Sequence, residues 1–265
     1  MELIIFILIG VLAGFAAGLF GVGGGLIIVP LLYGVFTQMA YDPEIVMHLA
    51  LGTSLATIIV TSISSLLAHH SNEAVLWPVF KKLAPGLAVG SFLGAGIAGL
   101  LSSAKLQLII GSFAIWVAYK MFVGAKKAVD QGKVLPSTTK QICAGAGIGV
   151  ASAVFGIGGG SLTVPYLNYY GVVMQKAVGT SAACGLPIAV AGAIGFVFFG
   201  VNDRALVANS LGYVHVYAFI GISSMSFFTA KLGAKVAHSL SPQMLKKCFA
   251  CLLSTVGCYF IFEGL

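Results

Sequence analysis

The chain contains one unusual glycine-rich segment twice. The segment GVGGGLIIVPLL (Gly21–Leu32) returns as GIGGGSLTVPYL (Gly156–Leu167), with seven of twelve positions identical at an offset of 135. Each copy places three consecutive glycines and a proline in otherwise apolar sequence. Each is followed by Gly-Thr-Ser, at Gly52–Ser54 and Gly179–Ser181. The repeat predicts a broken helix at equivalent places in two related halves.

The composition indicates that the solvent of this chain is a lipid bilayer. Hydrophobic residues make up 59% and charged residues 8%, and the mean hydropathy is +1.05. A soluble domain carries roughly 25% charged residues. Apolar runs of spanning length recur along the whole chain, which is typical of a polytopic membrane protein. The predicted fold class is all-α, a polytopic transmembrane helical bundle.

The two halves are predicted to be two transmembrane repeats. LGAGIAGLLSS (Leu93–Ser103) resembles LGAKVAHSLSP (Leu232–Pro242), so the duplication covers nearly the whole chain. The predicted domains are a first repeat over residues 1–125, a cytoplasmic linker over 126–140 and a second repeat over 141–265. Each repeat is expected to hold one glycine-rich hairpin and three spanning helices.

The distribution of lysine and arginine predicts how the repeats are related. If the chain turns back at each break, twelve of these residues fall on one side of the membrane and two on the other. If each break only kinks one spanning helix, the split is eight against six. Cytoplasmic loops are enriched in lysine and arginine. The turning arrangement is therefore favoured, with inverted repeats, both termini outside and the central linker cytoplasmic.

A glycine turn followed by a short helix is suited to binding an anion. The first turn of a helix carries N–H groups without intrahelical partners and the positive end of the helix dipole. Glycine lets a ligand approach the backbone and adopts positive φ without steric cost. Broken helices at membrane depth are tolerated where they are buried in protein or line a cavity, and paired breaks are the best sequence pointer to a transporter binding site.

Two breaks from related halves are expected to meet near the membrane midplane and frame one site. Ser161 and Thr163 add hydroxyl groups in the second copy, where the first has Leu26 and Ile28. The Thr-Ser pairs after each break either line the site or bond within their own helices. The predicted substrate-binding residues are Gly23, Gly24, Gly25, Thr53, Ser54, Gly158, Gly159, Gly160, Ser161, Thr163, Thr180 and Ser181.

Several classes of function are disfavoured by residues that the sequence lacks. No aspartate or glutamate falls well inside a predicted span, whereas proton relays and cation sites normally need one. The histidines and cysteines show no metal-ligand spacing, and no nucleophile–base arrangement indicates an enzyme. We therefore expect no catalytic residues, no metal and no cofactor. The net charge of +7 lies in loops, where it indicates membrane orientation and not nucleic-acid binding.

These motifs resemble those of the TauE/SafE family, the sulfite exporter or sulfonate permease family of membrane proteins. The resemblance rests on FGVGGG…VP (Phe20–Pro30), FGIGGG…VP (Phe155–Pro165) and the Gly-Thr-Ser after each, and it spans essentially the whole chain. It implies transport of sulfite, organosulfonates or other small sulfur-containing anions across the prokaryotic cytoplasmic membrane. Export is expected, because a negative cell interior drives anions outward and no ligands for a coupling cation are evident.

Two other readings stay open at this point. An anion channel would share the same hairpin architecture. A membrane-embedded enzyme or assembly factor could handle sulfur groups through Cys184, Cys248 and Cys251. The exact substrate, the coupling ion and the oligomeric state are also undetermined, and the sequence is compatible with a homo-oligomer.

Overall fold

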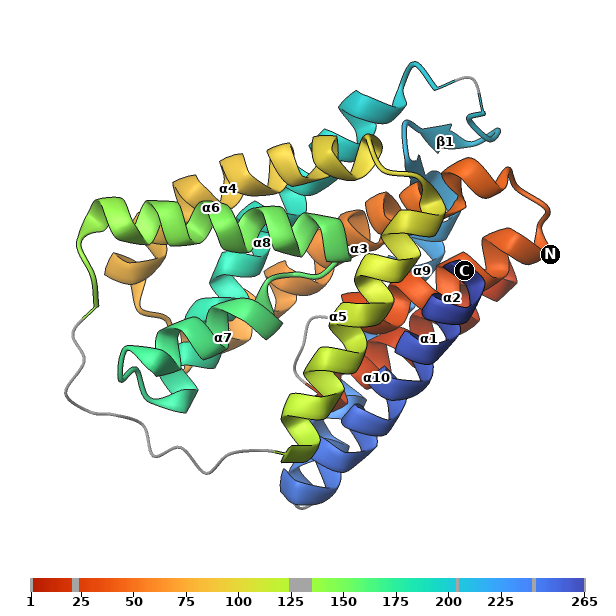
Figure 1. The fold of residues 1–265 in the computed structure, drawn as a ribbon. Helices are drawn as coiled ribbons and strands as arrows, with labels where there is room; N and C mark the ends of the chain where they lie inside the picture. Colours follow the sequence, from red (N-terminus) through yellow and green to blue (C-terminus); the bar gives the residue numbers. More distant parts are fainter. Residues whose placement is uncertain (1, 21–23, 124–134, 204, 240–241, 265) are drawn as a thin grey trace.

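The computed structural model describes residues 2–20, 24–123, 135–203, 205–239 and 242–264 (Figure 1). Within these ranges the chain is almost entirely helical, apart from the ribbon of β1 (Ser210–Leu211) and β2 (Val214–His215). This confirms the predicted all-α fold. The helices are α1 (Glu2–Phe20), α2 (Gly25–Gln38), α3 (Pro43–Ser71), α4 (Trp77–Gly99), α5 (Ser103–Val123), α6 (Thr138–Phe155), α7 (Gly160–Tyr169), α8 (Met174–Gly200), α9 (Val216–Ser239) and α10 (Pro242–Gly264).

Several of these helices are suited to crossing a bilayer. Within the described ranges, α3, α4, α8 and the Lys247–Gly264 part of α10 are long and apolar enough to do so. Helices α1, α2 and α9 contain shorter apolar stretches. A helix needs about 20 apolar residues to cross the hydrocarbon core. These helices support the expected multi-pass membrane protein.

The chain turns back on itself at both glycine-rich breaks. The rings of Phe6 in α1 and Phe36 in α2 lie with their centroids 6.1 Å apart. A continuous helix would separate positions 30 residues apart by about 45 Å. In the second half, α7 likewise runs back from the end of α6 (Figure 1), after Gly156 ends α6 in a left-handed conformation with φ of 64°. Each break therefore makes a hairpin and not a kink.

The two halves pack together through two equivalent helix pairs. The first helix of each half, α1 or α6, runs along the fourth helix of the other half, α9 or α4. Both pairs are parallel, because the numbers of the contacting residues rise together. Small residues at fourfold spacing let the backbones approach closely, as expected for helix packing in lipid. The contacts are Gly86 with Ile142, Gly90 with Ala146, Gly94 with Val150, Gly10 with Ile222 and Gly14 with Ser226.

In two further helix pairs, a helix packs against its own equivalent in the other half. Helix α3 packs against α8, and α5 packs against α10. Both pairs are antiparallel, because the contacting residue numbers rise on one helix and fall on the other. Antiparallel pairing of equivalent helices is the arrangement that inverted repeats require, and the inversion itself stays a prediction. The contacts are Gly52 with Phe196, Leu55 with Gly192, Ser62 with Gly185, Ala104 with Gly264 and Gly111 with Gly257.

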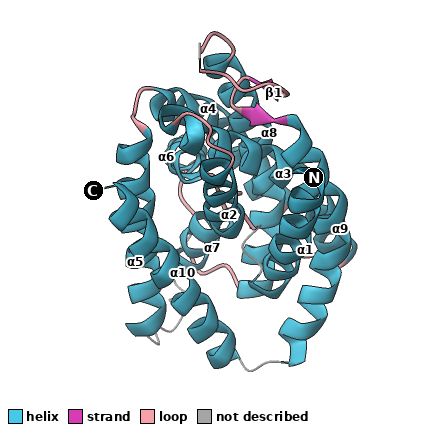
Figure 2. Cartoon of the chain, turned by 90° about the vertical axis from the view of Figure 1, so that its right-hand side faces the viewer, coloured by secondary structure: helices cyan, strands magenta, loops and turns pink. Residues whose placement is uncertain are grey.

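The connection between α8 and α9 covers one end of the helix assembly (Figure 2). It contains the β1–β2 ribbon, and the Tyr213 carbonyl in this connection lies against Gly52 of α3. The Tyr213 hydroxyl donates a hydrogen bond to Asp203 Oδ2 at 2.5 Å. This bond, and a second from the Ala205 backbone N–H, lower the pKa of the Asp203 carboxyl. The connection therefore contacts α3 at Gly52, the first residue of the first Gly-Thr-Ser.

Candidate functional site

Each of the two short hairpin helices is preceded by a glycine whose backbone conformation would be strained for any other residue. Gly24 precedes α2 with φ of 79°, and Gly159 precedes α7 with φ of 75°. These left-handed conformations cost an L-residue roughly 1–2 kcal/mol. The two glycines occupy equivalent positions in the repeat, so both halves start their short helix with the same backbone turn. Gly23, a predicted binding residue, lies outside the described residues.

The two breaks lie directly against each other, as the predicted site requires. A Cβ atom built on Gly25, the first residue of α2, would lie 2.9 Å from the Ile157 Cα atom and closer still to the Gly156 carbonyl oxygen. The same Gly156 oxygen accepts a hydrogen bond of 2.9 Å from Ser54 Oγ in α3. Backbone of the two glycine motifs, which are offset by 135 positions in the sequence, is thus in contact.

The start of α7 offers backbone donors that its own helix does not use. The first N–H groups that bond back to the Gly159 carbonyl belong to Leu162, at 3.1 Å, and Thr163, at 2.7 Å. The N–H groups of Gly160 and Ser161 precede them and have no carbonyl within the helix to bond. They lie at the positive end of the helix dipole. Backbone N–H groups in this position bind anions without a cationic side chain.

Three buried hydroxyl groups at this helix start have no hydrogen-bond partner among the described residues, and a fourth such hydroxyl lies in α8. Ser152 and Thr163 are fully buried, and Ser181 is 2% exposed. A Cβ atom on Gly159 would lie 3.5 Å from Thr163 Oγ1 and 3.7 Å from Ser152 Oγ, so these oxygens gather at the turn. Burying an unpaired hydroxyl costs about 1–3 kcal/mol. The unpartnered oxygens at the helix start are those of Ser152, Ser161 and Thr163, and the one in α8 is that of Ser181.

The first break presents apolar side chains where the second presents hydroxyls. At the offset of 135, Ser161 and Thr163 correspond to Leu26 and Ile28, which are both buried. The site predicted from the sequence did not include Ser152, whose counterpart is Ala17. Extending the comparison of the repeats four residues upstream of the glycine motif would have found it. Polar groups thus concentrate on the side of the second hairpin.

Thr53 and Thr180 hold neighbouring backbone in equivalent ways. Thr53 Oγ1 accepts a hydrogen bond of 2.9 Å from the His215 N–H, just before α9. Thr180 Oγ1 accepts one of 2.9 Å from the Leu76 N–H, just before α4. Each threonine therefore fixes the start of the fourth helix of the other half. Neither bond is the within-helix bond that the sequence suggested as an alternative, and a role in ligand binding stays a prediction.

The cysteines do not form a recognisable reaction centre. All five are free; Cys184 is buried, and the other four, Cys248 and Cys251 among them, are exposed. Among the residues that the structure describes, no group of three histidine, cysteine, aspartate or glutamate side chains is placed to hold a metal ion. The central feature of the molecule is the contact between the two breaks and the adjoining hydroxyl cluster.

The equivalent serines Ser54 and Ser181 are expected to respond differently to replacement by alanine. Ser54→Ala removes the bond to the buried Gly156 carbonyl, and we expect it to lower the free energy of unfolding by about 1–3 kcal/mol. Ser181→Ala removes a hydroxyl without a partner, so its cost should be near zero. Thermal unfolding of the two purified variants without ligand measures the difference. Equal destabilisation by both would contradict this assignment.

Comparison with known proteins places the chain in a family. The family model described as "Sulfite exporter TauE/SafE" matches residues 6–260. A "Probable membrane transporter protein" of Haemophilus influenzae is 38% identical, over 95% of both chains. Proteins with similar names from Bacillus subtilis and Methanocaldococcus jannaschii are 27% and 25% identical, over 94% or more of each chain. No solved structure matches the chain significantly. The protein belongs to the TauE/SafE family of membrane proteins.

Proposed function

We propose that this membrane transporter carries small sulfur-containing anions, such as sulfite or organosulfonates, across the cytoplasmic membrane. The family and the names of its relatives support transport. The anion is proposed to bind where the two glycine-rich breaks meet, at the predicted glycines, serines and threonines. The linker over residues 126–140 is proposed to face the cytoplasm.

The observation that carries the proposal is the set of unpartnered hydroxyls at the start of α7 and in α8. Ser152, Ser161, Thr163 and Ser181 each retain a hydroxyl proton to donate. The free N–H groups of the first turn add further donors. An anion with three oxygens on sulfur accepts several hydrogen bonds at once. Such a ligand would satisfy the buried hydroxyls and would need no cationic side chain.

The apolar side of the site suits the carbon chain of an organic anion. Ile58 approaches Gly158, and Ile188 approaches Gly159. Both side chains are fully buried. A sulfonate has a charged group at one end and a short carbon chain at the other. It could place the former at the hydroxyls and the latter against these isoleucines.

The membrane potential favours export of an anion that moves alone. Each negative charge that leaves a cell with a negative interior gains about 2.3 kcal/mol per 100 mV. Alternating exposure of the site by movement between the two repeats would complete a carrier cycle, as in other transporters with broken helices. Saturable flux of sulfite from proteoliposomes would support a carrier, whereas flux that rises linearly with concentration would favour a channel.

A thermal-shift screen of purified protein tests the proposed substrate class. Sulfite, thiosulfate, sulfate and short sulfonates are compared with chloride at matched ionic strength, in N-methylglucamine salts. A ligand at 100 times its Kd should stabilise the protein by about 2.7 kcal/mol. Ser181→Ala should weaken this effect without lowering the ligand-free midpoint. If no sulfur anion stabilises the protein more than chloride does, the proposal is wrong.

A further inference from the structure

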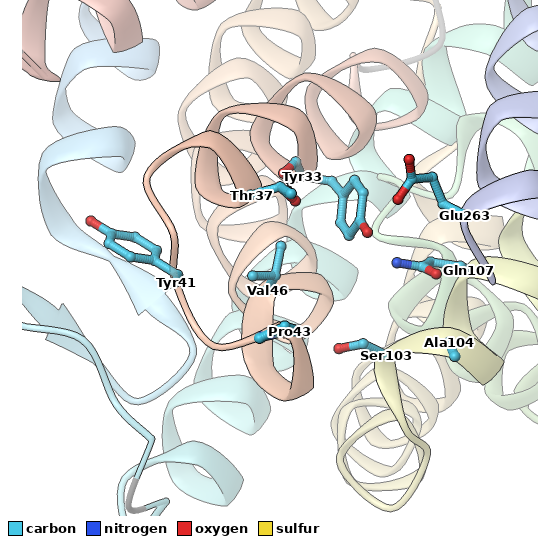
Figure 3. Close-up of a pocket in the computed structure, with 9 residues that line it drawn as sticks. All are labelled: Tyr33, Thr37, Tyr41, Pro43, Val46, Ser103, Ala104, Gln107 and Glu263. Carbon is cyan, nitrogen blue, oxygen red and sulfur yellow. Dashed lines mark hydrogen bonds between the residues drawn. The ribbon is translucent and has the colours of Figure 1, made fainter.

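A cavity lies at the far end of the first hairpin, away from the two breaks. It has a volume of about 300 Å³ and lies between the later part of α2, the starts of α3 and α5, and the end of α10. Figure 3 shows Tyr33, Gln107 and Glu263 converging on it from three different helices, with Thr37 and Ser103 nearby. Tyr33, Gln107 and Ser103 are buried, so the polar wall is built into the fold.

The hydroxyl oxygens of Thr37 and Ser103 in this cavity are directed to accept from a ligand and not to donate to it. Thr37 Oγ1 donates its proton to the Tyr33 carbonyl at 2.8 Å, and Ser103 Oγ donates its proton to the Glu44 carbonyl at 2.7 Å. Each hydroxyl oxygen therefore has only lone pairs left for a ligand. The Glu263 carboxylate accepts only. No lysine, arginine or histidine is among the described residues that line the cavity.

We propose that this cavity binds a monovalent metal cation such as Na⁺. Hard cations take oxygen ligands from carboxylate, amide and hydroxyl groups. The cavity offers the Glu263 carboxylate together with the neutral oxygens of Tyr33, Thr37, Ser103 and Gln107. One carboxylate balances one positive charge, whereas protein sites for divalent cations usually supply several. The hydroxyl cluster at α7 has the opposite character, because its protons are free.

The cation site would be linked to the anion site through α2. Helix α2 starts at Gly25, which contacts the second break, and carries Tyr33 and Thr37 to the cavity. These residues lie eight and twelve positions later, which is about 12–18 Å along a helix. Any effect of the cation on anion affinity must be matched by an equal effect of the anion on cation affinity.

This coupling rests on the proposed function, and it changes the force that drives transport of the anion. An anion that moves alone is driven outward, but an accompanying cation offsets one of its charges. With one Na⁺ per monovalent anion the cycle becomes electroneutral, and the Na⁺ and anion gradients together set its direction. Under the predicted orientation, with both termini outside, the cavity faces the outside of the cell, where Na⁺ is the more abundant.

Cation binding is tested on the full-length protein without any sulfur anion. The thermal midpoint is measured in NaCl and in N-methylglucamine chloride at equal ionic strength, and ²²Na⁺ binding is measured directly. We expect Na⁺ to raise the midpoint saturably. Glu263→Gln should raise the half-saturating Na⁺ concentration by at least about tenfold, and Thr37→Val, at an exposed position of α2, should raise it without affecting folding.

Glu44→Gln is the matched control. It makes the same change of charge at an exposed side chain at the start of α3, outside the cavity lining, and should leave Na⁺ binding unchanged. Equal midpoints in the two salts, or unchanged ²²Na⁺ binding in Glu263→Gln, would overturn the cation site. Stabilisation by sulfite in N-methylglucamine salt would then still support the anion site. Na⁺ binding without stabilisation by any sulfur anion would instead support the cavity and reject the proposed substrate class.

Discussion

Replacement of Gly159 by leucine is expected to abolish anion binding while the protein still reaches the membrane. Gly159 has φ of 75°, so any side chain there is strained by roughly 1–2 kcal/mol. A Cβ atom would also meet the Ile188 side chain and lie in front of Thr163 Oγ1 and Ser152 Oγ. The leucine side chain would therefore occupy the space that the proposed anion needs. The anion-dependent rise in thermal midpoint measures the loss.

A matched control for Gly159→Leu lies on the preceding helix of the same hairpin. Gly147 in α6 is exposed and has no other atom within 4 Å of a built Cβ. Gly147→Leu should bind anion normally and gain up to about 1 kcal/mol of stability, because leucine favours helices more than glycine does. Gly24→Leu, at the equivalent turn with φ of 79°, should behave like Gly159→Leu. Normal anion binding by both turn variants would reject the proposed site.

Replacement of Gly90 by leucine is expected to prevent the two halves from packing. A Cβ atom on Gly90 would lie 2.8 Å from the Ala146 Cα and C atoms and closer still to the Ala146 carbonyl oxygen. These are backbone atoms, which cannot rotate away. Overpacking costs about 3 kcal/mol or more when helices must separate. Lipid supplies no hydrophobic drive to hold separated helices together, so we expect a lower midpoint and less monodisperse protein.

The neighbouring residue Val89 provides the control for this effect. Val89 is 59% exposed in α4, so Val89→Leu adds volume toward lipid and should leave the midpoint unchanged. The comparison separates close helix contact from a general effect of larger side chains in α4. Equal midpoints for Gly90→Leu and Val89→Leu would show that α4 and α6 do not meet at Gly90.

The repeated glycine motif allowed the hairpins and their meeting point to be predicted. Three glycines cannot continue a stable helix in lipid without exposing backbone, so the breaks had to be buried in protein. Gly86, Gly90 and Gly94 recur at fourfold spacing in the sequence, a pattern that is typical of helix packing faces in lipid. The structure places these glycines against α6. The sequence could not say that their partner would be the first helix of the other half.

Other parts of the site depended on contacts that no local pattern records. Ser152 lies in an ordinary apolar helix, and only its closeness to Gly159 and Thr163 makes it part of the cluster. Thr53 and Thr180 were predicted for the ligand, yet each also accepts a bond from backbone far along the chain. Glu263 lies near the end of the sequence, and its neighbours in the cavity come from α2 and α5, so no local pattern indicated that it would line a cavity.

The sequence by itself determined that the chain is a duplicated helical membrane protein with two backbone breaks, because hydropathy and glycine spacing act over a few neighbouring residues. Only the tertiary structure decided which helices of the two halves pack against each other and which buried hydroxyls have no hydrogen-bond partner. It also decided that two hydroxyl oxygens in the cavity at the far end of the first hairpin offer only lone pairs to a ligand. Whether a hydroxyl oxygen offers its lone pairs depends on which group takes its proton, and for Ser103 that group is the Glu44 carbonyl, on another helix.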